Sequence, residues 1–166
     1  MGDSRIRLYG DPVLRRKCSE TLESQEYIEH LIKTMSRIMY VYKGIGLAAP
    51  QIGVLERIII ADVGEGLHSF INPKILWQQG KESMKEGCLS IPGIFFEIKR
   101  SKEIVIEAFS ERGEKTQYGA QGLLSRVLQH EIDHLDGIMI IDRVHKKKLK
   151  TVKKQLMEIS KGKAQA

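Results

Sequence analysis

The chain has 166 residues, of which 42% are hydrophobic and 29% are charged, so it can bury the core of one globular domain without disulfides. It contains no apolar run near the roughly 20 residues that cross a bilayer and no N-terminal stretch typical of a signal peptide, so we expect a cytoplasmic protein without membrane contact. The net charge of +6 lies at the C-terminal end, where eight lysines after His145 are set against one acid, Glu158.

The first predicted element is an amphipathic helix over residues 24–42. Its apolar residues recur at intervals of three and four and therefore share one helical face: Ile28, Leu31, Ile32, Met35, Ile38, Met39 and Tyr42. Gly44 supplies a signal that ends this helix. The glycine-rich run at residues 44–53 lacks the lysine of a P-loop, and a tight connection is its simplest interpretation.

The middle of the chain predicts short strands at residues 57–63, 69–72, 94–98 and 103–109. Each is rich in β-branched or aromatic residues and is bounded by turn-forming residues. A turn at 111–114 leads to another strand near 116–119, and helical patterns return at 122–136 and at about 146–160. Helices at both ends with consecutive strands between them favour an α+β fold in one domain, residues 1–166.

The pattern His-Glu-x-x-His occurs inside the helix predicted at 122–136, as His130, Glu131 and His134. Residues four apart lie on one helical face, so both imidazoles can bind a single metal ion. Glu131 would lie beside that ion, where it can accept a proton from water. Two unrelated histidines that happen to lie four residues apart are the plain alternative.

A catalytic metal site usually has three protein ligands and one open position. Ile140 occupies the place of the third histidine of a metzincin, which excludes that class. Two candidates are left: Glu158, as in a gluzincin-like peptidase, and Cys88, which follows Gly87. A metal would hold the Cys88 thiol deprotonated, whereas Cys18 is expected to be a small buried hydrophobe.

Three segments, GIGLAAPQIG, EGCLSIPG and QHEIDHLDG, occur in this order about forty residues apart, and together they resemble the signature motifs of peptide deformylases. The similarity extends from about Asp11 to Arg143. It implies mixed or antiparallel β-sheets packed around a central helix that carries the His-Glu-x-x-His motif, with one N-terminal and one C-terminal helix. It also implies a metal-dependent hydrolase that removes the formyl group from N-formylmethionyl nascent polypeptides and releases formate.

The resemblance also assigns the reacting residues. Cys88, His130 and His134 match the metal ligands of the family, and Glu131 matches the residue that moves protons. The metal implied is ferrous iron, Fe2+, which Zn2+, Ni2+ or Co2+ can replace. Ligand types alone are compatible with all four ions.

Further residues are implied to bind the substrate. The Gln51 side chain and the Leu89 backbone N–H would donate hydrogen bonds to the oxyanion of the tetrahedral intermediate. Gly46 would let the substrate backbone lie alongside it as an added strand. We expect the methionine side chain to enter an apolar pocket near Ile45, Leu123 and Val127.

The lysine-rich end has two interpretations. A lysine face on a terminal helix is usually solvated charge, but here it also fits a contact with ribosomal RNA that would place a monomeric enzyme near emerging chains. A basic RNA-binding protein is the alternative from another class, but the first 144 residues carry 19 basic and 20 acidic residues and no aromatic RNA-binding pattern. A deformylase-like protein without activity is disfavoured because Gln51, Cys88 and Glu131 are all present.

Overall fold

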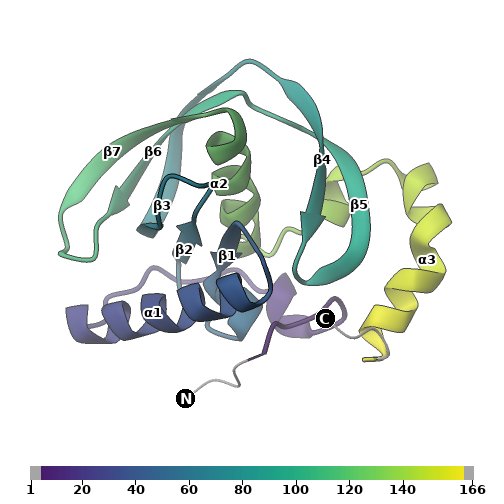
Figure 1. Cartoon of the computed structure of the whole chain (residues 1–166), viewed down its shortest axis with the longest axis horizontal. Helices are drawn as coiled ribbons and strands as arrows, with labels where there is room; N and C mark the ends of the chain where they lie inside the picture. Colours follow the sequence, from purple (N-terminus) through teal and green to yellow (C-terminus); the bar gives the residue numbers. More distant parts are fainter. Residues whose placement is uncertain (1–4, 163–166) are drawn as a thin grey trace.

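The computed structural model describes residues 5–162, and Figure 1 shows their arrangement. The α-helices of this part are α1 (Gln25–Val41), α2 (Gly122–Leu135) and α3 (Lys146–Ser160). Its strands are β1 (Gly46–Ala48), β2 (Ile58–Ala61), β3 (His68–Gln79), β4 (Glu82–Cys88), β5 (Ile91–Arg100), β6 (Glu103–Phe109) and β7 (Lys115–Gln121). Short 3-10 helices are η1 (Pro12–Arg15), η2 (Ala49–Ile52) and η3 (Ile140–Arg143).

The strands form two antiparallel sheets. One has five strands in the order β1-β2-β3-β6-β7, and the other is the hairpin of β4 and β5. β1 is an edge strand, since it pairs only with β2, with Gly46 opposite Ala61. The α+β class is therefore confirmed, and all the pairs between named strands are antiparallel.

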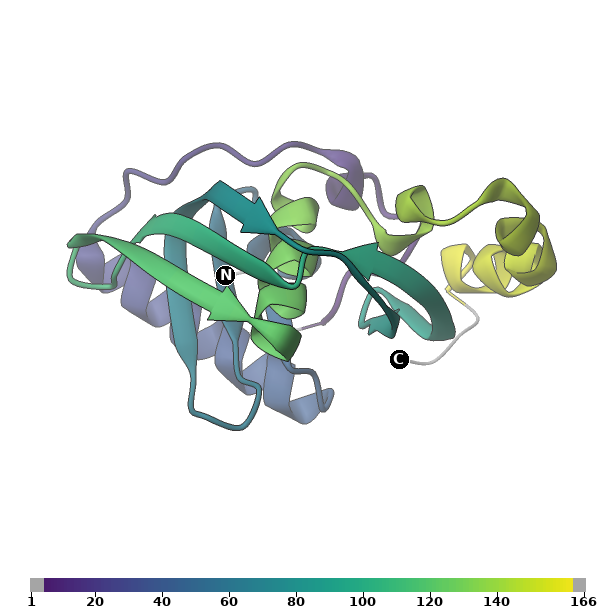
Figure 2. The ribbon, with the colours of Figure 1, turned by 90° about the horizontal axis from the view of Figure 1, so that it is seen from above.

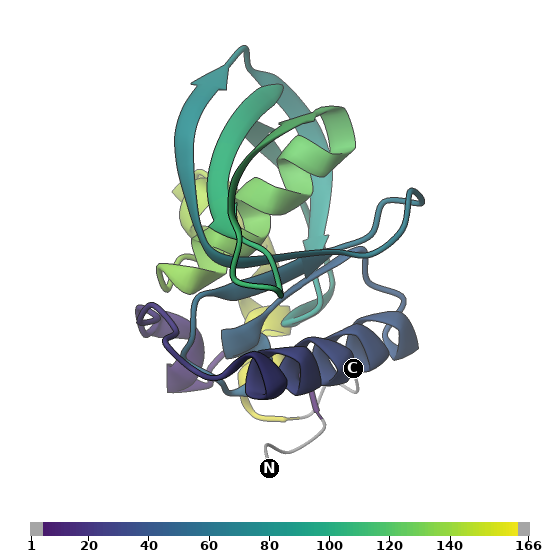
Figure 3. The same cartoon turned by 90° about the vertical axis from the view of Figure 1, so that its left-hand side faces the viewer.

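Two helices cover the β1–β2 part of the large sheet from opposite sides (Figures 1 and 3). β2 is buried on both faces, and its residues alternate between two cores: Ile59 and Ala61 pack with α2, whereas Ile58 and Ile60 pack with α1. Alternation follows from the two-residue period of a strand. The consequence is that α2 lies between the large sheet and the β4–β5 hairpin, which brings its polar residues close to both (Figure 1).

The C-terminal helix α3 lies at one end of the molecule, beyond the hairpin (Figure 2). Its buried residues Leu156 and Ile159 pack in a third core with Cys88, Phe96 and Met139. Most of the remaining α3 residues are exposed. Within residues 5–162, no helix is both long and apolar enough to cross a bilayer.

The predicted helices are confirmed, with Ser24 as the N-cap of α1. Four strand assignments need correction. β5 runs from Ile91 to Arg100, beyond both ends of the predicted span 94–98. β3 continues to Gln79, well past the predicted end at residue 72, through register shifts against β6 that accommodate Pro73. β4 was not predicted, because its sequence ESMKEGC has no β-branched residue and becomes a strand by pairing with β5. Residues 46–52 form β1 and η2 rather than a plain connection.

Candidate metal centre

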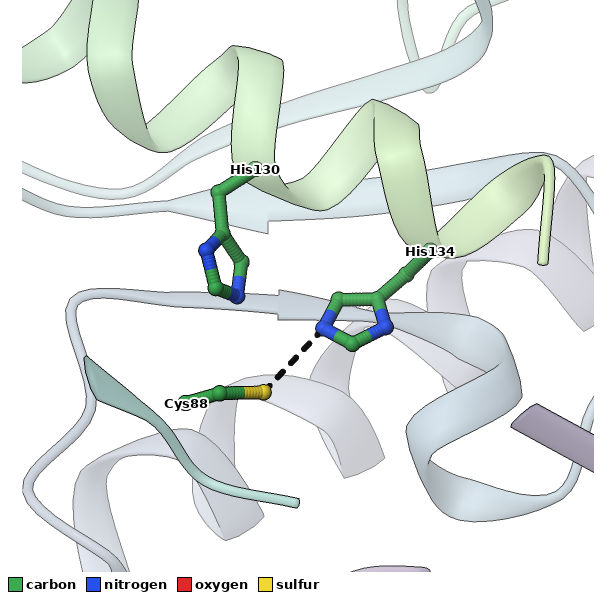
Figure 4. A group of neighbouring side chains, drawn as sticks. All are labelled: Cys88, His130 and His134. Carbon is green, nitrogen blue, oxygen red and sulfur yellow. Dashed lines mark hydrogen bonds between the residues drawn. The ribbon is translucent and has the colours of Figure 1, made fainter. Parts of the chain in front are cut away.

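Three side chains from two elements converge between α2 and the hairpin. Cys88 is the last residue of β4, and His130 and His134 lie on successive turns of α2 (Figure 4). One possible ligand atom from each lies within 4.8 Å of the other two. The Cys88 Sγ is 3.2 Å from His134 Nε2. One thiolate and two imidazoles are a suitable donor set for Zn2+ or another transition metal, so these residues fit a metal ion.

The local backbone explains how Cys88 reaches this point. The hairpin reverses at residues 89–90, directly after Cys88, and the chain approaches the turn through Gly87. A Cβ atom at Gly87 would lie 2.7 Å from the ring of Phe95 on the paired strand. Glycine at this position therefore lets β4 and β5 close tightly beside the cysteine.

The histidines have different surroundings. Burial lowers the pKa of His134 well below its usual value, so its ring is neutral, the form that binds metals. Burial would also lower the pKa of His130, but hydrogen bonding to Cys88 and Glu86 raises it to about 10. The surroundings of His130 therefore favour a positive charge beside Cys88 and Glu86, from either a proton or a metal ion.

Glu131 is buried beside the three side chains, and its Oε2 has no hydrogen-bond partner within the described part of the chain. Burial raises its pKa to about 7. A carboxyl group with such a pKa can both accept and donate a proton near neutral pH. Unpaired buried oxygens are rare in folded proteins, so this one has the features expected of a group that meets a ligand.

These groups open into a cavity of about 510 Å³. The cavity is lined by most of the residues that the sequence singled out: Ile45, Gly46, Gln51, Cys88, Leu89, Leu123, Val127, His130 and Glu131. His134 is not among the lining residues, and it is almost completely buried.

Two of these residues are held in defined positions. The Gln51 Oε1 accepts a hydrogen bond from the Ala48 N–H at 2.9 Å, which directs its Nε2 toward Ser90 Oγ, 3.2 Å away, and Cys88 Sγ, 3.7 Å away. Gly46 lies against α2: a Cβ there would be 2.5 Å from Glu131 Oε1. Absence of a side chain at Gly46 therefore makes room for the Glu131 carboxylate.

Comparison with known proteins agrees with this geometry. Residues 4–150 match the family model of polypeptide deformylase. The chain belongs to the polypeptide deformylase family. The peptide deformylase of Thermotoga neapolitana is 44% identical over 159 residues, covering 95% of this chain and 97% of the relative.

Solved structures of other deformylases share the fold. The Thermus thermophilus peptide deformylase is 39% identical with a TM-score of 0.90, over 96% of this chain and 98% of the other. That of Plasmodium falciparum is 36% identical with a TM-score of 0.91, over 95% and 96% of the two chains. The deformylase family is metal-dependent, in agreement with the convergence of Cys88, His130 and His134.

Sequence reasoning missed a buried ionic network behind the metal centre. Glu86 accepts hydrogen bonds from Arg100, at 2.7 and 3.0 Å, and from Arg126. Its Oε2 is 3.2 Å from His130 Nδ1, so His130 Nε2 is the ring nitrogen that could bind a metal ion. Burial alone would raise the pKa of Glu86, but His130 and Arg100 lower it to about 2.

The network continues through Asp133, one of the two variable positions of the His-Glu-x-x-His pattern. Asp133 accepts from Arg100 at 2.8 Å and from Arg143. Glu86 and Asp133 lie inside two of the deformylase motifs, and their place in these motifs is a signal that could have identified them. Arg100 follows a run of alternating strand residues and carries no such signal.

Proposed function

We propose that this chain is a metal-dependent hydrolase that removes the N-terminal formyl group from N-formylmethionyl nascent polypeptides and releases formate, with residues 1–166 acting as one catalytic domain. The observation that carries the proposal is the convergence of Cys88, His130, His134 and the buried Glu131 at the end of an open cavity. Family membership supports the reaction.

In this proposal Cys88, His130 and His134 hold one Fe2+ ion, which Zn2+, Ni2+ or Co2+ can replace. When bound, the metal supplies a Lewis acid that polarises the formyl oxygen and makes water a nucleophile at neutral pH. Glu86 holds the His130 ring through Nδ1, so Nε2 is the nitrogen that would bind the ion.

Glu131 moves the protons. It accepts a proton from the attacking water, and it gives this proton to the nitrogen of methionine as the carbon–nitrogen bond breaks. Formate leaves with the oxygen of water, and the peptide keeps a free amino group. Burial of Glu131, which raises its pKa to about 7, suits both transfers.

Two donors stabilise the negative charge that develops on the formyl oxygen. The Gln51 Nε2, held near Cys88 by the Ala48 hydrogen bond, is the first. The backbone N–H of Leu89, directly after Cys88, is the second. Loss of one such donor typically lowers turnover by about 10²–10³.

The substrate backbone adds to the free edge of β1 at Gly46. The methionine side chain enters the apolar part of the cavity, which is lined by Ile45, Leu123 and Val127. Val127 is buried on α2 next to Gly46, so replacement by Trp should fill this space and raise KM for formyl-Met peptides. An unchanged KM would show that Val127 does not contact the methionine side chain of the substrate.

We extend the proposal to α3. Its exposed lysines would contact ribosomal RNA and place a cytoplasmic, monomeric enzyme where nascent chains emerge. Reversing the charge of Lys153, Lys154 and Lys161 should weaken ribosome binding in a salt-dependent way while leaving formate release from a short peptide intact. Ribosome binding that does not change would contradict this role.

The reaction is tested by formate release from formyl-Met-Ala-Ser, with protein purified anaerobically in the presence of Fe(II) or Ni(II), beside Glu131→Ala. Turnover that disappears in the variant while the metal stays bound supports both the reaction and the proton carrier. No formate from a fully metallated wild type would refute the proposed activity.

A further inference from the structure

The rim of the cavity carries two exposed cations. Lys43 precedes β1 and Lys85 lies on β4, and both line the cavity. The acidic and arginine side chains that line it, Glu86, Arg126 and Glu131, are buried. Within residues 5–162, Lys43 and Lys85 take part in no ion pair, so both ammonium groups are available to a ligand.

The two lysines lie at equal chain distances from the reacting residues. Lys43 is three residues before Gly46, which touches Glu131, and Lys85 is three residues before Cys88. Residues 85–88 belong to β4 and span about 10 Å, whereas residues 43–45 form a turn after α1, with Lys43 at φ 55°, and span less than that. A substrate that extends away from the metal centre along the cavity would therefore meet both side chains two to four residues after its methionine.

The position of Lys85 is restrained by an aromatic side chain. Its Nζ lies 5.0 Å from the centre of the Phe95 ring, which is 57% exposed and lines the cavity. Glu97 is paired opposite Lys85 in the hairpin but does not line the cavity. The cation–π contact thus keeps the ammonium group on the rim.

We propose that Lys43 and Lys85 select formylated chains that carry Asp or Glu within the first few residues after the formyl-methionine. This inference rests on the proposed function and specifies its substrate class. Exposed lysine–carboxylate contacts are individually weak, so together they should favour acidic over basic peptides by about two- to tenfold in kcat/KM. Because the contacts lie away from the reacting atoms, the difference should appear mainly in KM and shrink as salt rises.

The test compares formyl-Met-Ala-Glu-Glu with formyl-Met-Ala-Lys-Lys on the metallated full chain, at low and high salt. The wild type should prefer the acidic peptide, and Lys43→Glu/Lys85→Glu should prefer the basic one. Faster turnover of the basic peptide by the double variant cannot result from misfolding. Lys99→Glu is the matched control, because Lys99 is exposed on the same hairpin but does not line the cavity.

Two results separate this inference from the proposed function. If all the peptides release formate but the double variant keeps the wild-type ratio, or Lys99→Glu shifts it equally, the rim lysines do not select the substrate. If no peptide releases formate, the proposed function fails. Affinities of the same two peptides for Glu131→Ala, measured by calorimetry, then decide independently whether the rim discriminates charge, and equal affinities would overturn the inference.

Discussion

Helices α2 and α3 have similar lengths and both are amphipathic, yet α2 is almost entirely buried and α3 is mostly exposed. In α2 every residue from 124 to 135 is buried, including Arg126, His130, Glu131 and Asp133. In α3 only Leu156 and Ile159 are buried. Each helix has an apolar face, so apolar periodicity alone does not distinguish the helix that carries the candidate metal ligands from the helix at the surface.

The difference lies in what the polar residues of each helix meet. Those of α2 contact partners from distant segments, such as Glu86 on β4 and Arg100 on β5. Buried charges are tolerated only when they are paired and hydrogen-bonded. Polar groups in α2 should therefore be sensitive to single substitutions, whereas those in α3 should be tolerant.

The largest effect is expected for Arg100→Met. This change removes a cation that is shared by Glu86 and Asp133 and leaves buried carboxylates with fewer partners. Urea unfolding should show a loss of about 3–5 kcal/mol in the free energy of unfolding. Arg143→Met is the control: Arg143 also pairs with Asp133 but is 41% exposed, and a loss as large as that of Arg100→Met would mean that burial is not the cause.

Leucine substitutions compare the apolar faces of the two helices. Leu128 of α2 is fully buried among several elements, whereas Leu156 of α3 lies between the hairpin and solvent. Leu128→Ala should lower the free energy of unfolding by about 2–5 kcal/mol. Leu156→Ala should lower it less, because a surface helix can shift to close the cavity. Equal losses by thermal or urea unfolding would contradict the comparison.

Gly46→Ala should have an intermediate effect. Its methyl group would be 2.6 Å from Val127 Cγ1 and would also displace Glu131, so β1 and α2 must separate. We expect a loss of about 1–3 kcal/mol in stability and a lower kcat for formate release. Gly119→Ala in β7 is the matched control, because within residues 5–162 no atom beyond the adjacent residues lies within 4 Å of a Cβ there. If Gly46→Ala behaves like the control, the close contact at Gly46 contributes neither to stability nor to turnover.

The smallest effect is expected for Lys153→Glu/Lys154→Glu on α3. Both side chains are exposed, and neither is in an ion pair within the described residues. The free energy of unfolding should change by less than about 0.5 kcal/mol per substitution. A larger change in the free energy of unfolding, measured in urea, would show that α3 needs its lysines to pack against the rest of the protein.

The elements that the sequence predicted well are those whose burial follows a simple period. α1, α2 and α3 each follow the helical period, and β6 was predicted at its observed bounds. β4 escaped prediction because only residues Glu86 and Cys88 are buried in it and its strand conformation depends on β5. Strand propensity reflects packing against neighbours, which the local sequence does not contain.

The residues of the candidate site also divide into those predicted from local sequence and those that depend on tertiary packing. Spacing alone predicted His130, Glu131 and His134, and ligand chemistry left Cys88 and Glu158 as candidates for the third ligand. The resemblance to deformylases favoured Cys88 and added other residues that line the cavity. The pairing of Glu86 with Arg100 was not predictable, because both charges would be ordinary surface residues of a two-stranded hairpin if α2 did not cover one face. That face becomes buried only through tertiary packing, so no local sequence pattern predicts its burial.

Metal content is the most direct test of the central claim that Cys88, His130 and His134 form one metal site. Protein purified anaerobically with Fe(II) or Ni(II) should bind about one ion per chain, and Cys88→Ala should lose it. Cys18→Ala is the matched control, since Cys18 is also buried but lies in another core, and it should keep the ion. Full metal content in Cys88→Ala, with loss of metal in Glu158→Gln, would contradict this account and support the gluzincin-like alternative.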